Sequence, residues 1–236
     1  MQEKIAKFEK VSLKEFTRAM TELFPKYQFK EDQLEIMLRE IPMPRRATTG
    51  SAGYDFFAPF EFILRPGTAI MIPTGIRVKF VENDGNDSDW ALLFLPKSGI
   101  GTKTSIRLSN TLGLIDCDYY YSPDNEGHIM IKLEMPSYNP SPVATSTTKF
   151  CSNLDIVRKA TKFIEHSKFV QAIFVKYGIT VDDEDYEKEE RNGGFGSTGT
   201  GIPSSPSFDD ASSGDPFTDE NAEEITDEEL MELLNS

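Results

Sequence analysis

The chain has 236 residues, of which 38% are hydrophobic and 27% charged, and its 25 Lys+Arg against 39 Asp+Glu give a formal net charge of -14. These values predict a soluble globular protein of one or at most two domains. No stretch has the roughly 20 apolar residues of a membrane-spanning helix. The first ten residues are charged throughout and lack the apolar core of a secretory signal, so the protein is expected to stay inside the cell.

Cysteine and histidine are scarce, with two of each: Cys117, Cys151, His128 and His166. A disulfide scaffold is therefore not expected. A structural zinc site built from Cys and His would need all four residues at once.

The excess negative charge lies at the end of the sequence. Residues 182–190 hold seven acids and one lysine, and residues 203–236 hold 11 acids and no Lys or Arg. Residues 1–181 carry 23 Lys+Arg and 21 Asp+Glu, and are nearly neutral at +2. Electrostatic arguments about partners must therefore treat the body and the tail separately, and direct binding to nucleic acid or to a membrane is not expected.

The first predicted element is an amphipathic helix over residues 11–24, within an N-terminal extension assigned to residues 1–32. Ser12 and Glu15 fit a capping box, Val11 and Phe16 fit a hydrophobic staple, and Pro25 ends the helix. Packing of this helix onto the body and binding of a partner both remain open.

A β domain is predicted over residues 33–181. Branched apolar or aromatic side chains recur at every second position in residues 34–38, 76–80 and 129–133, and residues 62–64 form a short apolar run. Short strands with Pro and Gly between them favour an all-β sandwich, barrel or jelly roll. Residues 136–149 are rich in Pro, Ser and Thr and predict an inserted loop, and a short helix is expected near residues 154–165.

Two segments follow the β domain: an acidic linker with a Gly-rich stretch at 182–202, and an acidic tail at 203–236. The composition of the tail predicts disorder, because it offers little apolar surface to offset the entropy of ordering. Residues 225–234 combine a possible capping box with a Leu stripe, which suits a short helix that folds on a partner's groove. A purely solubilising acidic tail is the alternative.

Residues 191–199 could form a phosphate-binding segment. Glycine backbone N–H groups approach anions closely, the hydroxyls of Ser197 and Thr198 and the guanidinium of Arg191 can donate to phosphate oxygens, and Phe195 offers a face for base stacking. A flexible linker is the simpler interpretation of such a Gly-rich run.

Two further segments could carry chemistry. Asp116 follows an apolar run and could accept a proton from water if it faces a cleft, or it could cap a hairpin turn. The loop at residues 96–101 has a cation, a hydroxyl and two glycines, and either holds phosphate or turns a corner.

Taken in order, five segments resemble the motifs of the homotrimeric dUTPase family, and the resemblance covers roughly residues 33–200. These segments are residues 49–55 (TGSAGYD), 96–99 (PKSG), 110–119 (NTLGLIDCDY), 170–174 (VQAIF) and 193–199 (GGFGSTG).

This resemblance implies a jelly-roll-like β fold (β-clip), a homotrimer with active sites shared between subunits, and Mg²⁺-dependent hydrolysis of dUTP to dUMP and pyrophosphate. That reaction keeps uracil out of DNA and supplies dUMP for thymidylate synthesis. Asp116 corresponds to the base that activates the water attacking the α-phosphorus. Tyr119 corresponds to the residue under the deoxyribose that leaves no room for a 2′-hydroxyl. The uracil edge would be read by Asn110, Gly113, Ile115 and the hairpin backbone through Met130.

The resemblance also assigns the phosphate-binding residues and the metal. Phe195 would stack on the uracil, and Asp55 would contact only the waters of a Mg²⁺ that the triphosphate itself chelates. The phosphates would be held by Lys97, Ser98, Gly99, Gln171, Arg191, Gly196, Ser197 and Thr198.

The chain departs from the family pattern at several positions. Lys97 and Lys168 stand where arginines are usual, and lysine lacks the planar bidentate geometry of arginine. The segment before Phe195 is one residue shorter than usual. Residues 120–126 form an insertion before Gly127.

Two rival functions remain open at this point. A dCTP deaminase shares the fold, although the pairing of Asp116 with Tyr119 favours the hydrolase. A non-catalytic dUTP sensor that regulates a protein partner is the second rival.

Overall fold

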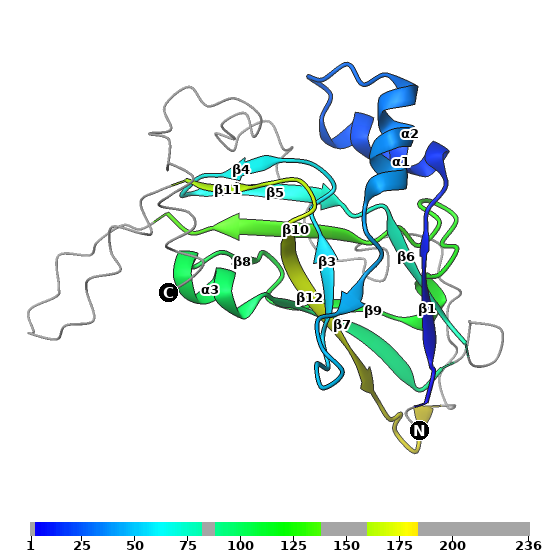
Figure 1. Cartoon of the computed structure of the whole chain (residues 1–236). Helices are drawn as coiled ribbons and strands as arrows, with labels where there is room; N and C mark the ends of the chain where they lie inside the picture. The colour runs from blue at the N-terminus through cyan, green and yellow to red at the C-terminus, as the bar shows by residue number, and fades with distance from the viewer. Residues whose placement is uncertain (1–2, 82–87, 138–159, 184–236) are drawn as a thin grey trace, which may run out of the picture.

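The computed structural model describes residues 3–81, 88–137 and 160–183 (Figure 1). In these ranges twelve strands form four antiparallel sheets. The largest sheet has the order β2 (Arg45–Arg46), β3 (Tyr54–Phe57), β12 (Lys168–Lys176), β7 (Trp90–Pro96) and β9 (Gly113–Ile115). A second sheet has the order β5 (Thr68–Pro73), β10 (Met130–Met135) and β8 (Arg107–Leu108). Two pairs complete the set: β1 (Ala6–Lys10) with β6 (Ile76–Phe80), and β11 (Thr161–Phe163) with β4 (Phe62–Leu64).

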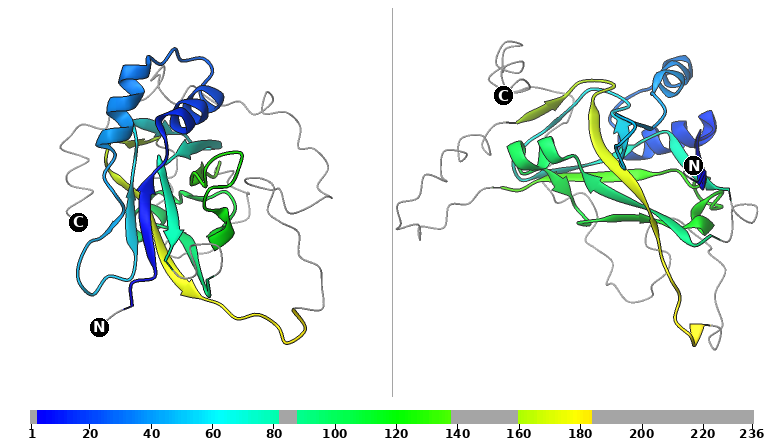
Figure 2. Two further views of the ribbon diagram at one scale, coloured as in Figure 1. Left: turned by 90° about the vertical axis from the view of Figure 1, so that its right-hand side faces the viewer. Right: turned by 60° about the horizontal axis from the view of Figure 1, so that its bottom comes forward.

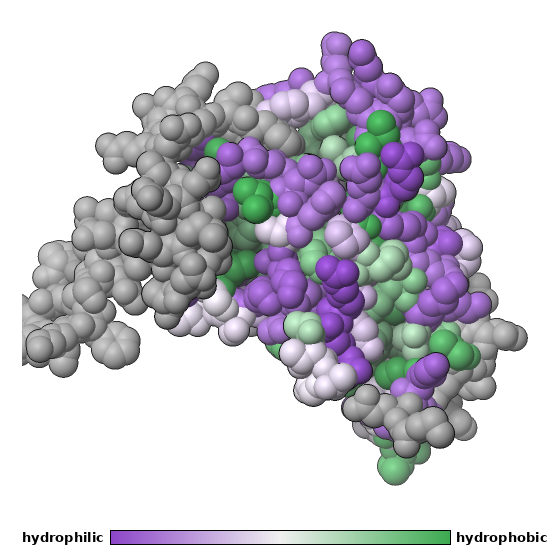
Figure 3. Space-filling view, viewed as in Figure 1, coloured by the Kyte–Doolittle hydropathy of each residue, from purple (hydrophilic) through white to green (hydrophobic). Residues whose placement is uncertain are grey.

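Three helices accompany the strands: α1 (Leu13–Leu23), α2 (Glu31–Glu40) and α3 (Ser98–Thr104). Figures 1 and 2 show α1 and α2 together at one end of the strand body, with β1 running along β6. The surface over this helical end is mostly hydrophilic (Figure 3). Among the described residues, no helix is both long enough and apolar enough to cross a membrane.

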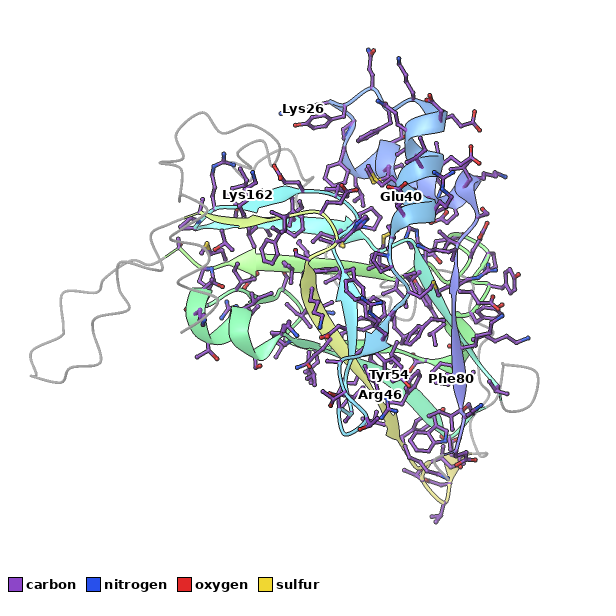
Figure 4. The ribbon with its side chains drawn as sticks, in the orientation of Figure 1. Lys26, Glu40, Arg46, Tyr54, Phe80 and Lys162 are labelled. Atoms are coloured by element: carbon purple, nitrogen blue, oxygen red, sulfur yellow. The ribbon has the colours of Figure 1, made fainter. Side chains whose placement is uncertain are left out.

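Phenylalanine rings dominate the core, and several of their contacts join different sheets. Phe8 of β1 meets Phe56 of β3 edge to face with ring centroids 5.5 Å apart, and Phe62 of β4 meets Phe169 of β12 at 6.5 Å. Tyr54 and Phe80, labelled in Figure 4, both contact the ring of Phe174. Each such ring buries a large apolar area and favours edge or offset contacts, so these contacts fix how the sheets face one another.

The predicted strands at residues 62–64, 76–80 and 129–133 are confirmed as β4, β6 and β10. In β6 the side chains of Ile76, Val78 and Phe80 are buried and those between them are not. Period-2 alternation therefore identified the face of this strand that packs on the core.

Helix α1 forms as predicted, and Ser12 caps it by accepting a hydrogen bond from the backbone N–H of Glu15 at 3.1 Å. The reciprocal half of the predicted capping box is wrong. The Ser12 N–H donates to Glu126 instead, at 3.0 Å, because the carboxylate of Glu15 turns inward to His128. Phe16 and Met20 are fully buried, and each contributes roughly 1.5–3 kcal/mol of hydrophobic stabilisation.

The predicted strand at residues 34–38 is wrong, because these residues belong to helix α2. Leu34, Leu38 and Ile41 are buried, whereas Ile36 is 46% exposed. Positions i and i+4 share a face in both a strand and a helix, so only the residue at i+2 distinguishes them. Glu31 and Asp32 in the first turn suit the positive end of the helix dipole.

Helix α2 packs against the turn between β5 and β6 at Gly75. The φ of Gly75 is +70°, and a Cβ there would lie 2.9 Å from the side chains of both Leu38 and Ile41. Two features therefore favour glycine at this position: the positive φ, and the close approach of the Leu38 and Ile41 side chains.

Strand β1 was not predicted. It pairs with β6 from Ala6↔Phe80 to Lys10↔Ile76, so the N-terminal extension is joined to the body by a sheet ladder. The ammonium of Lys10 donates to the carbonyls of Leu38, at 2.7 Å, and of Ile41, which ties β1 to the carboxyl end of α2. Helix α2 crosses the proposed boundary at residues 32/33, and the division into 1–32, 33–181, 182–202 and 203–236 stays a prediction.

Two local predictions also need correction. The short helix expected near residues 154–165 is wrong at Thr161–Phe163, which form β11 against β4; residues 154–159 lie outside the described residues. The loop expected at residues 96–101 contains the start of α3, whose first turn is closed by N–H groups of Ile100 and Gly101 donating to Lys97 O.

The tie between β1 and α2 can be tested with Lys10→Met, which keeps most of the side-chain volume and removes two charge-assisted hydrogen bonds. We expect the free energy of unfolding to fall by about 1–3 kcal/mol, measured by urea denaturation. Lys7→Met is the matched control on the same strand, because the Lys7 side chain is 70% exposed. Equal stabilities of the two variants would contradict the assigned role of Lys10.

Candidate active site

One cavity of about 330 Å³ lies between the second sheet and the edge of the largest sheet. It brings together four of the residues that the sequence assigned to base recognition. These are Asn110, Gly113, Ile115 and Met130. The remaining lining residues were not predicted: Met71, Phe94, Leu108, Ser109, Ile131 and Lys132.

The cavity forms where β8 and β10 separate. The ladder between them joins Leu133 to Leu108 and Glu134 to Arg107, and the chain then leaves β8 through a turn at Asn110 toward β9. Gly113 allows β9 to lie close to β7, because a Cβ there would be 3.2 Å from Phe94 Cβ. A mostly apolar cavity with one amide side chain suits a flat heterocycle that carries a few polar edge atoms.

Asp116 follows Ile115 directly, at the end of β9. Its backbone is extended, and its carbonyl accepts from the N–H of Tyr119 to begin a 3-10 turn at Cys117–Tyr119. The residue is half-buried, between buried Ile115 and buried Cys117. Asp116 thus directly follows a residue that lines the cavity, and it remains partly accessible to water, as a general base requires.

Tyr119 is buried with 3% exposure and is held through its hydroxyl. The hydroxyl donates to His128 O at 2.9 Å and accepts from the side-chain amide of Asn125 at 2.6 Å. The orientation of the ring is therefore fixed by two groups, one of them from the insertion at residues 120–126.

A charged cluster joins three strand ends at Asp55. Lys97 Nζ lies 2.9 Å from Asp55 Oδ1, and Lys168 Nζ lies 2.8 Å from Oδ2. Burial alone would raise the pKa of the Asp55 carboxyl, but the hydrogen bonds from Lys168 and Lys97 outweigh it and hold this pKa below its usual value. Two ammonium groups on one carboxylate give the cluster a net charge of +1, which favours the binding of an anion.

Gln171, Ser98 and Gly99 border this cluster. Gln171 lies opposite Asp55 in the β12–β3 ladder, and its side-chain amide donates to Pro96 O at 3.4 Å. Gly53 makes room for it, since a Cβ there would lie 3.0 Å from Gln171 Oε1. Ser98 and Gly99 are exposed in the first turn of α3, where backbone N–H groups point away from the helix.

Lys168 was noted in the sequence only as a departure from the family pattern. Regular alternation would put it on the opposite face from Gln171, three residues later. A β-bulge between Lys168 and Val170 shifts the register, so Lys168 pairs with Phe57 and shares a face with Asp55. A bulge leaves little trace in a single sequence, so this member of the cluster could not be found by pattern.

The remaining predicted residues lie outside the described residues: Arg191, Phe195, Gly196, Ser197 and Thr198. Within the described ranges, no group of three or more His, Cys, Asp or Glu side chains is arranged to hold a metal ion.

Comparison with known proteins decides the family. The dUTPase family profile matches residues 39–135. The deoxyuridine 5'-triphosphate nucleotidohydrolase of Lactococcus lactis is 33% identical over 159 residues, which are 67% of this chain and 89% of that protein. The Haemophilus ducreyi protein of the same name is 32% identical over 68% of this chain and 89% of its own. The chain belongs to the dUTPase family.

The resemblance inferred from the five motifs is thereby confirmed, and with it the all-β, jelly-roll-like fold of the body. Among solved structures, the dUTPase of Streptococcus mutans aligns with 73% of this chain and 97% of its own, at 20% identity and a TM-score of 0.46. The structure of a mutant dUTPase from phage phi11 of Staphylococcus aureus aligns at 19% identity, with a TM-score of 0.42 over 61% of this chain and 90% of its own.

The contribution of the second lysine can be measured with Lys168→Met. This change reduces the net charge of the Asp55 cluster from +1 to 0, so we expect the KM for dUTP to rise about tenfold, equivalent to about 1.4 kcal/mol. Lys176→Met on the same strand is the control, since Lys176 is 61% exposed and pairs with Asp89 at 3.1 Å. An unchanged KM in Lys168→Met would show that Lys168 only neutralises Asp55.

Proposed function

We propose that the cavity at Asn110 and Gly113 binds the uracil of dUTP, and that Asp116 activates the water that releases dUMP and pyrophosphate. Hydrolysis of dUTP to these products is the activity of the family to which the chain belongs. The observation that carries the residue assignments is the position of Asp116, directly after a residue that lines the cavity.

The uracil-binding part of the proposal rests on the shape and chemistry of the cavity. Its lining is mostly apolar, and Asn110 offers both an amide donor and a carbonyl acceptor. Backbone groups of β10 at Met130 supply further polar atoms at the edge of the cavity. This combination can pair with the N3–H and the carbonyls of uracil, whereas cytosine would present a donor where uracil has an acceptor.

The triphosphate would extend from the cavity toward cationic and N–H donors. In the described residues these include Lys97, Ser98, Gly99 and Gln171, with Lys168 as the second cation, gathered where β3, β7 and β12 meet. Arg191, Gly196, Ser197 and Thr198 would complete the phosphate contacts and Phe195 would stack on the base; these assignments rest on the motif resemblance. Positioning and charge neutralisation are the main demands of phosphoryl chemistry.

Asp116 would take a proton from the attacking water while the water adds to the α-phosphorus. The bond from that phosphorus to the bridging oxygen then breaks, and pyrophosphate leaves. Tyr119, held by His128 and Asn125, would support the deoxyribose so that the α-phosphorus faces Asp116.

Mg²⁺ is the proposed cofactor, held mainly by the triphosphate. Each carboxylate oxygen of Asp55 faces an ammonium group, so this residue does not fit a direct metal ligand. A role through metal-bound water is compatible with its position beside the phosphate-binding cluster. Mg²⁺ dehydrates reluctantly and is commonly bound through phosphates, and when bound it would neutralise charge on the leaving pyrophosphate.

We also infer a homotrimer with shared sites, on the strength of the family resemblance. Sedimentation or mass measurement in solution tests it. A dCTP deaminase would release ammonia from dCTP, whereas this proposal expects pyrophosphate from dUTP only, so one assay with both nucleotides and Mg²⁺ separates the two.

Asp116→Asn tests the base. The change keeps the size and removes the proton acceptor, so we expect turnover to fall by about a hundred- to ten-thousand-fold while dUTP still binds, as measured by calorimetry. Asp118→Asn is the matched control, two residues along and exposed. Full turnover in Asp116→Asn would refute the assignment.

Two truncations separate the tail from the enzyme. Deletion of residues 203–236 removes the tail but keeps the Gly-rich motif, and we expect kcat and KM to be unchanged. Deletion of residues 191–236 also removes that motif, and we expect turnover to be lost. If the shorter deletion abolishes activity, the tail takes part in catalysis and is not reserved for solubility or a partner.

A further inference from the structure

The N-terminal extension and the insertion at residues 120–126 contact each other directly. Ser12 donates to the carboxylate of Glu126 from its backbone N–H at 3.0 Å and from its hydroxyl at 2.6 Å. Tyr120 donates to Glu9 at 2.8 Å. Figure 1 shows this green loop beside β1 and below α1. Two additions that are far apart in the sequence therefore form one structural unit.

The centre of this unit is a buried pair, Glu15 with His128. Glu15 is 4% exposed and His128 fully buried, and Glu15 Oε1 lies 3.0 Å from His128 Nδ1. His128 Nε2 accepts a hydrogen bond from the Gly75 N–H at 2.8 Å. Because one ring nitrogen must accept, the proton lies on Nδ1 and points to Glu15. Burial lowers the pKa of His128, which agrees with this neutral tautomer.

Glu15 is itself held by Arg18. The guanidinium donates two hydrogen bonds to the carboxylate, from Nε to Oε2 at 2.8 Å and from Nη2 to Oε1 at 2.9 Å. Burial would raise the pKa of Glu15, but the hydrogen bonds from His128 and Arg18 hold it below its usual value. A fixed anion thus faces the imidazole, and its position is set by helix α1.

The same histidine reaches the candidate active site through its backbone. His128 O accepts from the Tyr119 hydroxyl, and two residues later Met130 lines the cavity. The turn that carries both is tight: Gly127 has a φ of +77°, and a Cβ there would lie 2.5 Å from Tyr119 O. A shift of the His128 backbone would therefore move the acceptor of the Tyr119 hydroxyl, and a ring that is held at Nδ1 by Glu15 and at Nε2 by Gly75 restrains such a shift.

We propose that Glu15 is a positioning residue for the dUTPase reaction, because it fixes His128 and thereby the Tyr119 ring that excludes a 2′-hydroxyl. This rests on the proposed function in one respect, that Tyr119 lies under the deoxyribose. The N-terminal extension is then part of the machinery that separates dUTP from UTP. Its residues 6–24 lie outside the range matched by the family profile.

Glu15→Gln is the decisive variant, since it keeps the side-chain shape and removes the charge. We expect the ratio of kcat/KM for dUTP to kcat/KM for UTP to fall about tenfold. A change of this size is within the range by which a single contact alters the discrimination between two substrates. Glu22→Gln is the matched control. Glu22 pairs with the same Arg18 but is 60% exposed, so its ratio should equal that of the wild type.

Two further variants keep the test decisive. Tyr119→Phe removes the hydroxyl that meets His128 O, so its effect should not add to that of Glu15→Gln in the double variant. If Glu15→Gln does not fold, Arg18→Met loosens Glu15 from its more exposed side and should lower the ratio in the same direction. An unchanged ratio in a folded Glu15→Gln or Arg18→Met, with only a lower Tm, would overturn the proposal and leave Glu15 a purely structural residue.

Failure of the proposed function has a different signature. Tyr119→Leu removes the aromatic platform, and an unchanged dUTP-to-UTP ratio in that folded variant would show that Tyr119 does not face the sugar. A ratio that collapses in Tyr119→Leu but is unaffected by Glu15→Gln would refute the role of Glu15 alone.

Discussion

The pairing of β12 with β3 on one side and β7 on the other is the constraint on which the site depends. It sets Gln171 opposite Asp55 and aligns β12 with the end of β7, where Lys97 begins the turn into α3. On its other side β7 pairs with β9, which ends at Ile115, directly before Asp116. Four segments spread over more than a hundred residues are therefore brought together by one set of ladders, with backbone hydrogen bonds fixing the register.

Local signals in the sequence were sufficient for part of this arrangement. Strand β6 is recognisable from the alternation of its side chains. The segment from Asn110 to Tyr119 contains a turn and strand β9, so the cavity-lining residues of this segment are close in sequence. Helix α2 was mistaken for a strand because buried positions four apart fit both periods, and only the exposure of Ile36 between them decides for the helix. The bulge that turns Lys168 toward Asp55 depends on pairing with β3, and strand β1 depends on pairing with β6. No local sequence pattern predicts either pairing.

The net charge of the whole chain is -14, but the local charge of the Asp55 cluster is positive. The acids in excess follow Val181, whereas the residues proposed to bind phosphate lie around a carboxylate that two ammonium groups outweigh. Each lysine also holds the other in place through Asp55, so the pair presents two cations without placing them in direct contact. If Lys97 and Lys168 bind phosphate as proposed, two ammonium groups fixed by one carboxylate would take the place of the single guanidinium that is usual in the family.

The buried Glu15–His128 pair raises the question of why an ion is kept where an apolar contact would serve. Burying a carboxylate carries a desolvation penalty of several kcal/mol, and well-packed apolar replacements are often as stable. An apolar pair, however, cannot select one imidazole tautomer, and without that selection Gly75 N–H and Glu15 would not hold the ring from both sides. Specific orientation is what the Glu15 carboxylate adds, and the residue that it orients carries the acceptor of the Tyr119 hydroxyl. The conformation of the site is thus stabilised from a helix that never enters the cavity.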